Sequence, residues 1–308
     1  MPRDRAPTET TGGLLREGIE RLREAGSETA RLDAELLLGH AVGAGRTVIL
    51  AHPEAPVGLG AAKHYRADLA RRVRGEPVAY LRGLKEFFGL DFRVDRRALI
   101  PRPETERLVE LAEAELVRRI DTHQRTPGSA RIRVVDVGTG SGAIAVALAV
   151  TLRRRGALTS VQLVALDLSN DALDLARENA GGHALADAIA FHQADLLPTE
   201  GDPGGPPYDL VLANLPYVRH DALDGLPVAA SFEPVIALDG GADGLAVIAR
   251  LLAQLPAALV EGGLALLEIG ADQGDAIVER CQDLLPGWRC EVEPDLAGLP
   301  RVARIRRG

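Results

Sequence analysis

Residues 134–142 read Val134-Val135-Asp136-Val137-Gly138-Thr139-Gly140-Ser141-Gly142. The valines and the preceding Ile132 form a short β-branched run, which predicts a buried strand. The glycines then permit a tight turn and a close approach of the backbone to a ligand. Residues 143–149 are apolar and helix-forming. This order of strand, glycine turn and helix predicts a nucleotide-binding α/β unit.

The spacing of the glycines indicates which ligand to expect. Gly138, Gly140 and Gly142 give G-x-G-x-G, one residue short of the dinucleotide fingerprint G-x-G-x-x-G. A pyrophosphate on the helix N-terminus is therefore disfavoured, and S-adenosylmethionine, which has no phosphate, fits better. We expect cofactor contacts from Gly138, Thr139, Gly140, Ser141 and Gly142.

Two further apolar runs end in an acid. Residues 161–166 lead to Asp167, whose carboxylate can accept both hydroxyls of a ribose. Ser169 is then available as the N-cap of a helix that begins near Asn170. Residues 190–196 predict a third strand that ends in Asp195 and Leu196. We expect Asp195 to accept a hydrogen bond from an adenine amino group and Leu196 to pack on the ring.

A fourth strand, residues 208–212, leads to Asn214-Leu215-Pro216-Tyr217 at the carboxyl edge of the sheet, where open α/β folds bind ligands. An amide nitrogen has a delocalised lone pair and must be oriented before it can attack. The side-chain oxygen of Asn214 and the carbonyl of Leu215 can accept its N–H bonds, while Pro216 stiffens the turn. Tyr217 packs over the planar target group or is a core tyrosine. The pattern predicts a methyltransferase that acts on nitrogen.

Composition indicates a two-domain protein outside the membrane. The 308 residues are 46% hydrophobic, enough for substantial cores. No apolar run reaches the length of a membrane span and no secretory leader is present, so we expect a cytoplasmic protein. Cys281 and Cys290 lack metal-ligand spacing and are expected to be reduced. No His/Cys/Asp cluster is evident, so no metal site is predicted.

The charge distribution bears on the partner. A net charge of −8 argues against stable nucleic-acid binding, which needs Lys or Arg at several phosphates. Residues 60–107 nevertheless contain 12 Lys or Arg against 7 Asp or Glu. This stretch is either a basic face that attracts an acidic protein partner or a solvated helix surface. We expect a monomer.

The pattern along the chain predicts three parts. Residues 1–83 are expected to form a helical substrate-docking domain, 84–103 a connecting β-hairpin, and 104–308 the catalytic domain. Further strands are expected at 264–269 and 302–305, and helices at 104–120, 244–255 and 272–285.

Several segments besides the glycine turn and residues 214–217 resemble one family over nearly the whole chain. They are residues 75–80, 83, 86–90, 99–106, 232–234, 237–245 and 295–301. Together they resemble the glutamine N5-methyltransferases of the PrmC/HemK family, and the most specific is Pro101-Arg102-Pro103-Glu104-Thr105-Glu106.

This resemblance implies a class I S-adenosylmethionine-dependent methyltransferase fold, α/β and Rossmann-like, with a seven-stranded mostly parallel sheet and a small N-terminal helical domain. It implies methyl transfer to the glutamine N5 of the GGQ motif of peptide chain release factors. Cofactor contacts would come from the positions named above and from Asn214, and substrate contacts from Asn214, Leu215, Pro216 and Tyr217. Arg102 would lie near cofactor or substrate, or would pair with Glu104 or Glu106.

Three alternatives stay open. The family usually has Asn-Pro-Pro-Tyr, whereas Leu215 stands second here, and Asn-Leu-Pro-Tyr also resembles the motif of RNA adenine N6-methyltransferases. An RNA or DNA adenine N6-methyltransferase is therefore the first alternative. A nicotinamide-dependent oxidoreductase shares the strand, turn and helix but not the glycine spacing. A non-catalytic binding module is the third.

Overall fold

The chain forms two compact units in the computed structural model, which describes residues 9–123 and 130–307. One unit comprises Met1–Leu84 and Pro227–Phe232, and the other comprises Lys85–Leu226 and Glu233–Gly308. Parts of the expected domains, at 1–8, 124–129 and 308, lie outside the described residues. Within the described ranges, no helix is long and apolar enough to cross a membrane.

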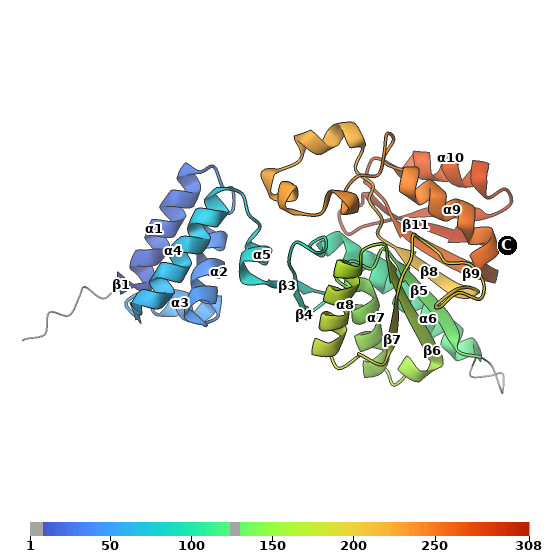
Figure 1. Ribbon diagram of the computed structural model, residues 1–308, viewed down its shortest axis with the longest axis horizontal. Helices are drawn as coiled ribbons and strands as arrows, with labels where there is room; N and C mark the ends of the chain where they lie inside the picture. Colours follow the sequence, from blue (N-terminus) through green and yellow to red (C-terminus); the bar gives the residue numbers. More distant parts are fainter. Residues whose placement is uncertain (1–8, 124–129, 308) are drawn as a thin grey trace, which may run out of the picture. The chain divides into compact units, whose positions relative to one another are not determined.

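The first unit is a small helical bundle (Figure 1). Its elements are β1 (Glu9–Thr10), α1 (Thr11–Glu24), α2 (Ala30–Val42), α3 (Arg46–Ala51), β2 (Pro56–Val57), α4 (Leu59–Val73), α5 (Val78–Arg82) and the 3₁₀ helix η4 (Val228–Phe232). Leucines at helical spacing, among them Leu14, Leu22 and Leu69, are fully buried in its core. The Tyr65 hydroxyl donates to the Leu14 carbonyl at 3.2 Å and so ties α4 to α1.

The second unit contains a seven-stranded sheet. Its strands are β5 (Ile132–Val137), β6 (Val161–Asp167), β7 (Ile189–Gln193), β8 (Tyr208–Ala213), β9 (Leu259–Glu268), β10 (Arg289–Pro294) and β11 (Pro300–Arg306). The order across the sheet is β10-β11-β9-β8-β5-β6-β7, and only β11 runs antiparallel to its neighbours. The predicted fold class is therefore confirmed.

Helices cover both faces of this sheet (Figure 1). They are α6 (Glu106–His123), α7 (Ala143–Arg154) and α8 (Asn170–Gly182) on one face, and α9 (Ala246–Ala258) and α10 (Gly274–Leu284) on the other. Because side chains alternate along a strand, Ile132 and Val134 of β5 pack on the first face while Val135 and Val137 pack on the second. A strand buried on both faces reads as a continuous apolar run, as the sequence showed.

Shorter elements complete the unit. They are the hairpin strands β3 (Leu84–Phe87) and β4 (Leu90–Arg93) and the 3₁₀ helices η1 (Pro103–Thr105), η2 (Leu158–Ser160), η3 (His220–Gly225) and η5 (Val235–Ala237). The hairpin joins the core of this unit, because Phe87 and Phe92 are buried with residues of α6 and α7.

The edge strands β10 and β7 of the large sheet differ from the sequence expectation. The pattern did not indicate β10, because Glu291, Glu293 and Pro294 give this edge strand charged and proline residues that are depleted in strands. The third strand ends at Gln193, so Asp195 and Leu196 lie in the loop that follows it. A strand at the edge of a sheet pairs on one side only, so it can form from a sequence with a weak strand pattern.

The glycine turn connects β5 to α7 at the point where strand order reverses, since β6 and β8 flank β5. Gly142 has φ +80°, and a Cβ on it would lie 3.0 Å from the Cβ of Ala176 in α8. Glycine at this position therefore allows the start of α7 to pack closely against α8.

We predict that Gly142→Ala destabilises the fold more than Gly156→Ala does. Both glycines have positive φ, but a Cβ on Gly156 would meet nothing within 4 Å. Gly156→Ala should therefore cost only the left-handed backbone strain, about 1 kcal/mol. Gly142→Ala should cost at least about 1 kcal/mol more through overpacking, measured by urea unfolding. Equal losses in the two variants would contradict the packing role.

Candidate active site

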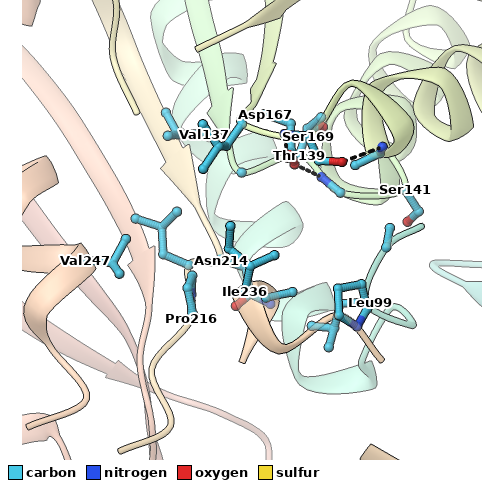
Figure 2. Close-up of a pocket in the computed structure, with 18 of the residues that line it drawn as sticks. Leu99, Val137, Thr139, Ser141, Asp167, Ser169, Asn214, Pro216, Ile236 and Val247 are labelled. Atoms are coloured by element: carbon cyan, nitrogen blue, oxygen red, sulfur yellow. Dashed lines mark hydrogen bonds between the residues drawn. The ribbon is translucent and has the colours of Figure 1, made fainter. Parts of the chain in front are cut away.

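A pocket of about 780 Å³ lies at the carboxyl ends of β5, β6 and β8. This volume is in the range of small-molecule sites. Its wall includes eight of the nine predicted cofactor residues, namely Gly138, Thr139, Gly140, Ser141, Asp167, Asp195, Leu196 and Asn214, and also Leu215 and Pro216. Gly142 and Tyr217 are not part of the wall. Figure 2 shows Asp167 and Asn214 approaching the same space from two different strands.

A buried carboxylate holds the glycine turn. Asp136 Oδ2 accepts a hydrogen bond from Thr139 Oγ1 at 2.6 Å, and the Thr139 amide donates to the Leu166 carbonyl at 2.8 Å. Burial raises the pKa of Asp136 to about 7. Gly138 has φ +70°, and a Cβ there would lie 2.9 Å from a methyl group of Leu215. The hydrogen bond between Thr139 and Asp136 thus fixes the turn, and Leu215 leaves no room for a side chain at Gly138.

Asp167 connects the glycine turn to the start of α8. Its Oδ2 accepts from the Gly140 amide at 2.8 Å and its Oδ1 from the Ser169 amide at 2.9 Å. Burial raises the pKa of this carboxyl above its usual value. Ser169 is the N-cap of α8 and accepts from Ala172, which confirms the sequence prediction. Each carboxylate oxygen has a second lone pair, so Asp167 can still accept two hydroxyls from a ligand.

The loop after β7 brings Asp195 and Leu196 to the pocket. Asp195 Oδ2 pairs with Arg250 Nη2 at 2.6 Å, and both side chains are about half exposed. Leu196 is buried and has φ +67°, a left-handed conformation that is rare for a bulky residue. Backbone strain of this kind occurs at ligand sites when the surrounding structure maintains it. Here it accompanies an apolar side chain in the pocket wall.

A short chain of side chains orients the Asn214 amide. Asn214 Nδ2 donates to Thr105 Oγ1 at 2.9 Å. Thr105 also interacts with Glu268, a carboxyl whose pKa is raised by burial. In this contact the NH₂ side of Asn214 donates and the Thr105 oxygen accepts. The other side of the amide, Oδ1, remains an acceptor at the pocket.

Glu268 and Tyr217 lie behind this chain. Glu268 is 1% exposed, and burial raises its pKa to about 7. The Tyr217 hydroxyl donates to Glu268 Oε1 at 3.3 Å, and burial raises the pKa of Tyr217 to about 12. The Tyr217 ring packs against the core beneath α9 and α10. The alternative in which Tyr217 is a core tyrosine therefore fits this geometry better than a contact with the target group.

Two segments support the loop 214–217. The Val218 amide donates to the Leu238 carbonyl at 3.0 Å, and the Gly240 amide donates to the Val218 carbonyl at 2.7 Å. A Cβ on Gly240 would lie 2.8 Å from the Pro216 carbonyl. From the other side, Gln273 Nε2 donates to the Tyr217 carbonyl at 3.0 Å. The closeness of the Pro216 carbonyl explains why position 240 is a glycine.

Arg102 pairs with Glu233, which corrects the predicted alternatives Glu104 and Glu106. Arg102 Nη2 donates to Glu233 Oε1 at 2.6 Å, and Glu233 Oε2 accepts from the Ile100 amide at 3.1 Å. Glu233 is 5% exposed, so its charge requires these partners. Arg102 also lines the pocket. Two segments far apart in the sequence are thereby joined at the pocket wall.

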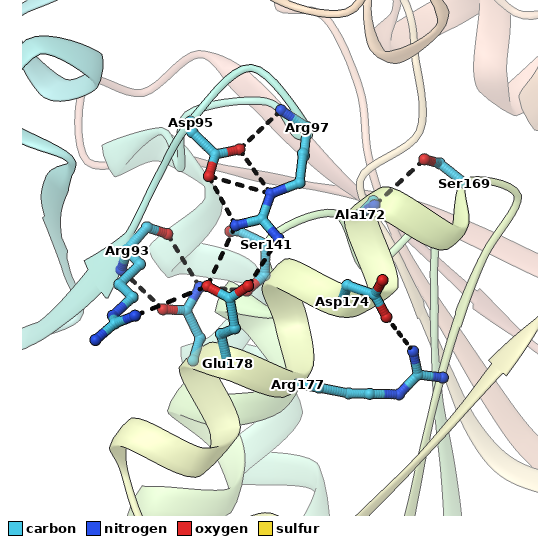
Figure 3. Close-up of polar contacts among 10 residues, drawn as sticks. Arg93, Asp95, Arg97, Ser141, Ser169, Ala172, Asp174, Arg177 and Glu178 are labelled. Atoms are coloured by element: carbon cyan, nitrogen blue, oxygen red, sulfur yellow. Dashed lines mark hydrogen bonds and ion pairs between the residues drawn. The ribbon is translucent and has the colours of Figure 1, made fainter.

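Sequence reasoning missed the polar contacts beside the glycine turn (Figure 3). Asn179 of α8 is buried and donates to the Ser141 carbonyl at 2.9 Å, while its Oδ1 accepts from the Arg93 amide at 2.7 Å. Arg97, another pocket residue, pairs with Asp95 at 2.7 Å and with Glu178 at 2.8 Å. A polar residue on the apolar face of α8 was the available signal for Asn179.

Part of the basic stretch 60–107 is neutralised within the first unit. Arg66 pairs with Glu9 and Glu17, and Arg72 pairs with Asp33. These arginines therefore hold the bundle together instead of presenting an unpaired basic face.

We predict that Glu268 makes stability fall as the pH rises toward 7. A carboxyl whose folded pKa of about 7 exceeds its ordinary value of 4.5 stabilises the fold below pH 4.5. That contribution is lost as the pH rises through about 7, by up to about 3 kcal/mol. Urea unfolding between about pH 5 and pH 8 should show a smaller fall for Glu268→Gln than for the wild type.

The matched control is Glu261→Gln, an exposed position on the same strand. Its pH profile should follow the wild type. Parallel profiles for Glu268→Gln and the wild type would exclude the assigned titration.

Comparison with known proteins agrees with this geometry. The family model for the PrmC N-terminal domain matches residues 13–83, and a methyltransferase domain model matches residues 129–260. The solved structure of the hMettl16 catalytic domain in complex with MAT2A 3′UTR hairpin 6 aligns with a TM-score of 0.52 at 15% identity, covering 80% of this chain and 81% of that chain. That likeness shows a shared fold.

Two curated relatives match over almost their entire length. The release factor glutamine methyltransferase of Deinococcus radiodurans is 37% identical over 294 residues, which is 96% of this chain and 97% of the relative. That of Moorella thermoacetica is 39% identical over 287 residues, 93% of this chain and 95% of the relative. The chain therefore belongs to the release factor glutamine methyltransferase family.

Proposed function

We propose that this protein transfers a methyl group from S-adenosylmethionine to the side-chain amide nitrogen of the glutamine in the GGQ motif of peptide chain release factors. The observation that carries the proposal is the fixed orientation of Asn214. Its Nδ2 is held by Thr105, so its Oδ1 stays an acceptor beside the cofactor pocket. An acceptor at this position suits a substrate that presents N–H groups.

The residues present fit S-adenosylmethionine. Asp167 has lone pairs for both ribose hydroxyls, and Asp195 and Leu196 offer an acceptor and an apolar surface for adenine. At Gly140 even an added Cβ would have no neighbour closer than 3.8 Å, so a ligand can lie against the backbone there. When bound, the cofactor supplies a methyl group on a positively charged sulfur.

The substrate amide would be held by two acceptors, Asn214 Oδ1 and the Leu215 carbonyl. The amide nitrogen gains positive charge as it forms the new bond, so both acceptors interact more strongly in the transition state than in the ground state. Together they are worth about 2–4 kcal/mol, by analogy with an oxyanion-hole donor. Positioning thus contributes more to the rate than acid-base chemistry does. After methyl transfer, the extra proton on the amide nitrogen leaves to water.

Tyr217 and Glu268 support this arrangement from behind. The Tyr217 hydroxyl donates to Glu268, and Glu268 interacts with Thr105, whose hydroxyl oxygen accepts from the Asn214 amide. We assign Tyr217 this supporting role in place of direct substrate contact.

The same proposal covers the partners. The net charge of −8 supports a protein substrate over stable nucleic-acid binding. A monomer in the cytoplasm is the state we propose for the enzyme. Leu215 replaces a proline of the usual family motif, but its side chain is buried against Gly138, and the backbone carbonyl is retained.

Transfer of labelled methyl tests the function directly. Purified protein and labelled S-adenosylmethionine are incubated with a release factor, with its GGQ glutamine-to-alanine variant, and with bulk RNA. Label should appear on the wild-type factor alone. Label on RNA alone would replace the proposal with the adenine N6 alternative, and label on neither would remove the assigned activity.

We predict that Asn214→Ala lowers kcat roughly 10²-fold, the cost of one transition-state hydrogen-bond partner. Binding of S-adenosylmethionine, measured by calorimetry, should stay near that of the wild type, because the glycine turn and Asp167 are unchanged. Normal turnover in this variant would contradict the role of Asn214.

Thr105 supplies the matched pair of controls. Thr105→Val removes the hydroxyl that orients Asn214 and should lower kcat more than it changes the cofactor Kd, whereas Thr105→Ser keeps the hydroxyl and should retain most of the turnover. A kcat that falls in Thr105→Val but not in Thr105→Ser would show that the hydroxyl acts by positioning Asn214. Equal losses in the two variants would contradict that role.

A further inference from the structure

Three potential metal ligands converge on the surface of the first unit, and none of them lines the pocket. They are His40 in the last turn of α2 and His64 and Asp68 on α4. One ligand atom from each lies within 4.8 Å of the other two. His64 and Asp68 are four residues apart and therefore share one face of the helix. The rings of His40 and His64 meet edge to face with centroids 5.5 Å apart.

The carboxylate of this group has an unsatisfied oxygen. Asp68 is 3% exposed, and its Oδ2 has no hydrogen-bond partner among the described residues. His64 Nε2 approaches that oxygen at 3.2 Å without forming an aligned hydrogen bond. Arg71 lies 3.8 Å from the other oxygen, Oδ1, and directs its hydrogen bonds to Glu76. A buried carboxylate oxygen without a donor is costly, and a bound cation would satisfy it.

We propose that His40, His64 and Asp68 form a binding site for a divalent transition metal, with Zn²⁺ as the ion of best fit. Two imidazole nitrogens and one carboxylate oxygen are a ligand set that Zn²⁺ accepts, with water in the fourth position. Ca²⁺ and Mg²⁺ are disfavoured because they prefer more oxygen ligands. Imidazole ligands also suit Ni²⁺ and Cu²⁺, so the site selects a class of ions.

The geometry needs only a small adjustment. In a tetrahedral Zn²⁺ site with bonds of 2.0–2.1 Å, the ligand atoms are roughly 3.3 Å from one another. Here the three ligand atoms lie within 4.8 Å of one another and would have to move closer together. His40 and His64 are exposed, so their rings can rotate toward the fixed, buried Asp68 without disturbing the core. Because the ligands come from α2 and α4, a bound ion would connect these two helices and stabilise the bundle.

The sequence did not indicate this site. His64 and Asp68 are separated by only one helical turn, but His40 belongs to a different helix and joins them only when α2 packs against α4. The proposal is independent of the methyl-transfer function, since it concerns the stability of the helical unit.

Zinc binding to the full-length protein without an affinity tag tests the proposal. The protein is stripped with a chelator, and Zn²⁺ is titrated in competition with a chromophoric chelator. Co²⁺ serves as a spectroscopic probe of the ligands. We expect one Zn²⁺ per chain and a higher Tm in its presence. His40→Ala and His64→Ala should each weaken Zn²⁺ binding at least about tenfold, and the double variant should lose the Tm shift.

His52→Ala is the matched control, because His52 is another exposed histidine of the same unit and lies beside a single acid, Glu54, at 3.7 Å. It should bind Zn²⁺ like the wild type. Asp68→Asn, which keeps the volume but removes the charge, should also weaken binding, and circular dichroism checks that each variant is folded. Absence of Zn²⁺ binding to the wild type, or equal binding by the double histidine variant, would overturn the proposal.

Discussion

The pairing of β5 with β8 is the interaction on which the candidate site depends. These parallel strands align Val134 with Leu210 and Val137 with Ala213, so that their carboxyl ends coincide. The glycine turn that follows one strand and the Asn214 loop that follows the other therefore lie side by side. Because β6 pairs on the opposite edge of β5, the strand order reverses here and leaves a crevice above the sheet. Ligand and substrate groups can meet at this point of the fold.

Both loops are held by buried acids at a cost in stability. Asp136 accepts from the Thr139 hydroxyl of the glycine turn, and Glu268 accepts from the Tyr217 hydroxyl of the Asn214 loop. Burial raises the pKa of each acid to about 7. Such buried polar groups stabilise a fold little, but they fix the direction of the atoms they bind. The buried acids thus lower the stability of the fold somewhat, but they help to fix the orientation of the Asn214 amide.

The same sheet can serve other substrates, because fold alone does not define function. The hMettl16 catalytic domain shares the architecture at 15% identity. In the present chain, segments around the sheet make the polar contacts of the pocket. The segment 99–106 contributes Thr105 to Asn214 and Arg102 to Glu233. We propose that substrate specificity resides in such loop contacts, which the strands position.

The sequence by itself determined the central strands of the sheet, the glycine turn and the loop of Asn214, because apolar periodicity and glycine act locally. It also indicated which strand ends carry Asp167 and Asn214. Only the tertiary structure decided that Thr105, 109 residues from Asn214, holds the amide, that Arg102 pairs with Glu233, and that His40 lies beside His64. The packing of helices and strands determines which of these residues meet. Because the residues are far apart in the sequence, no local pattern shows that they will be in contact.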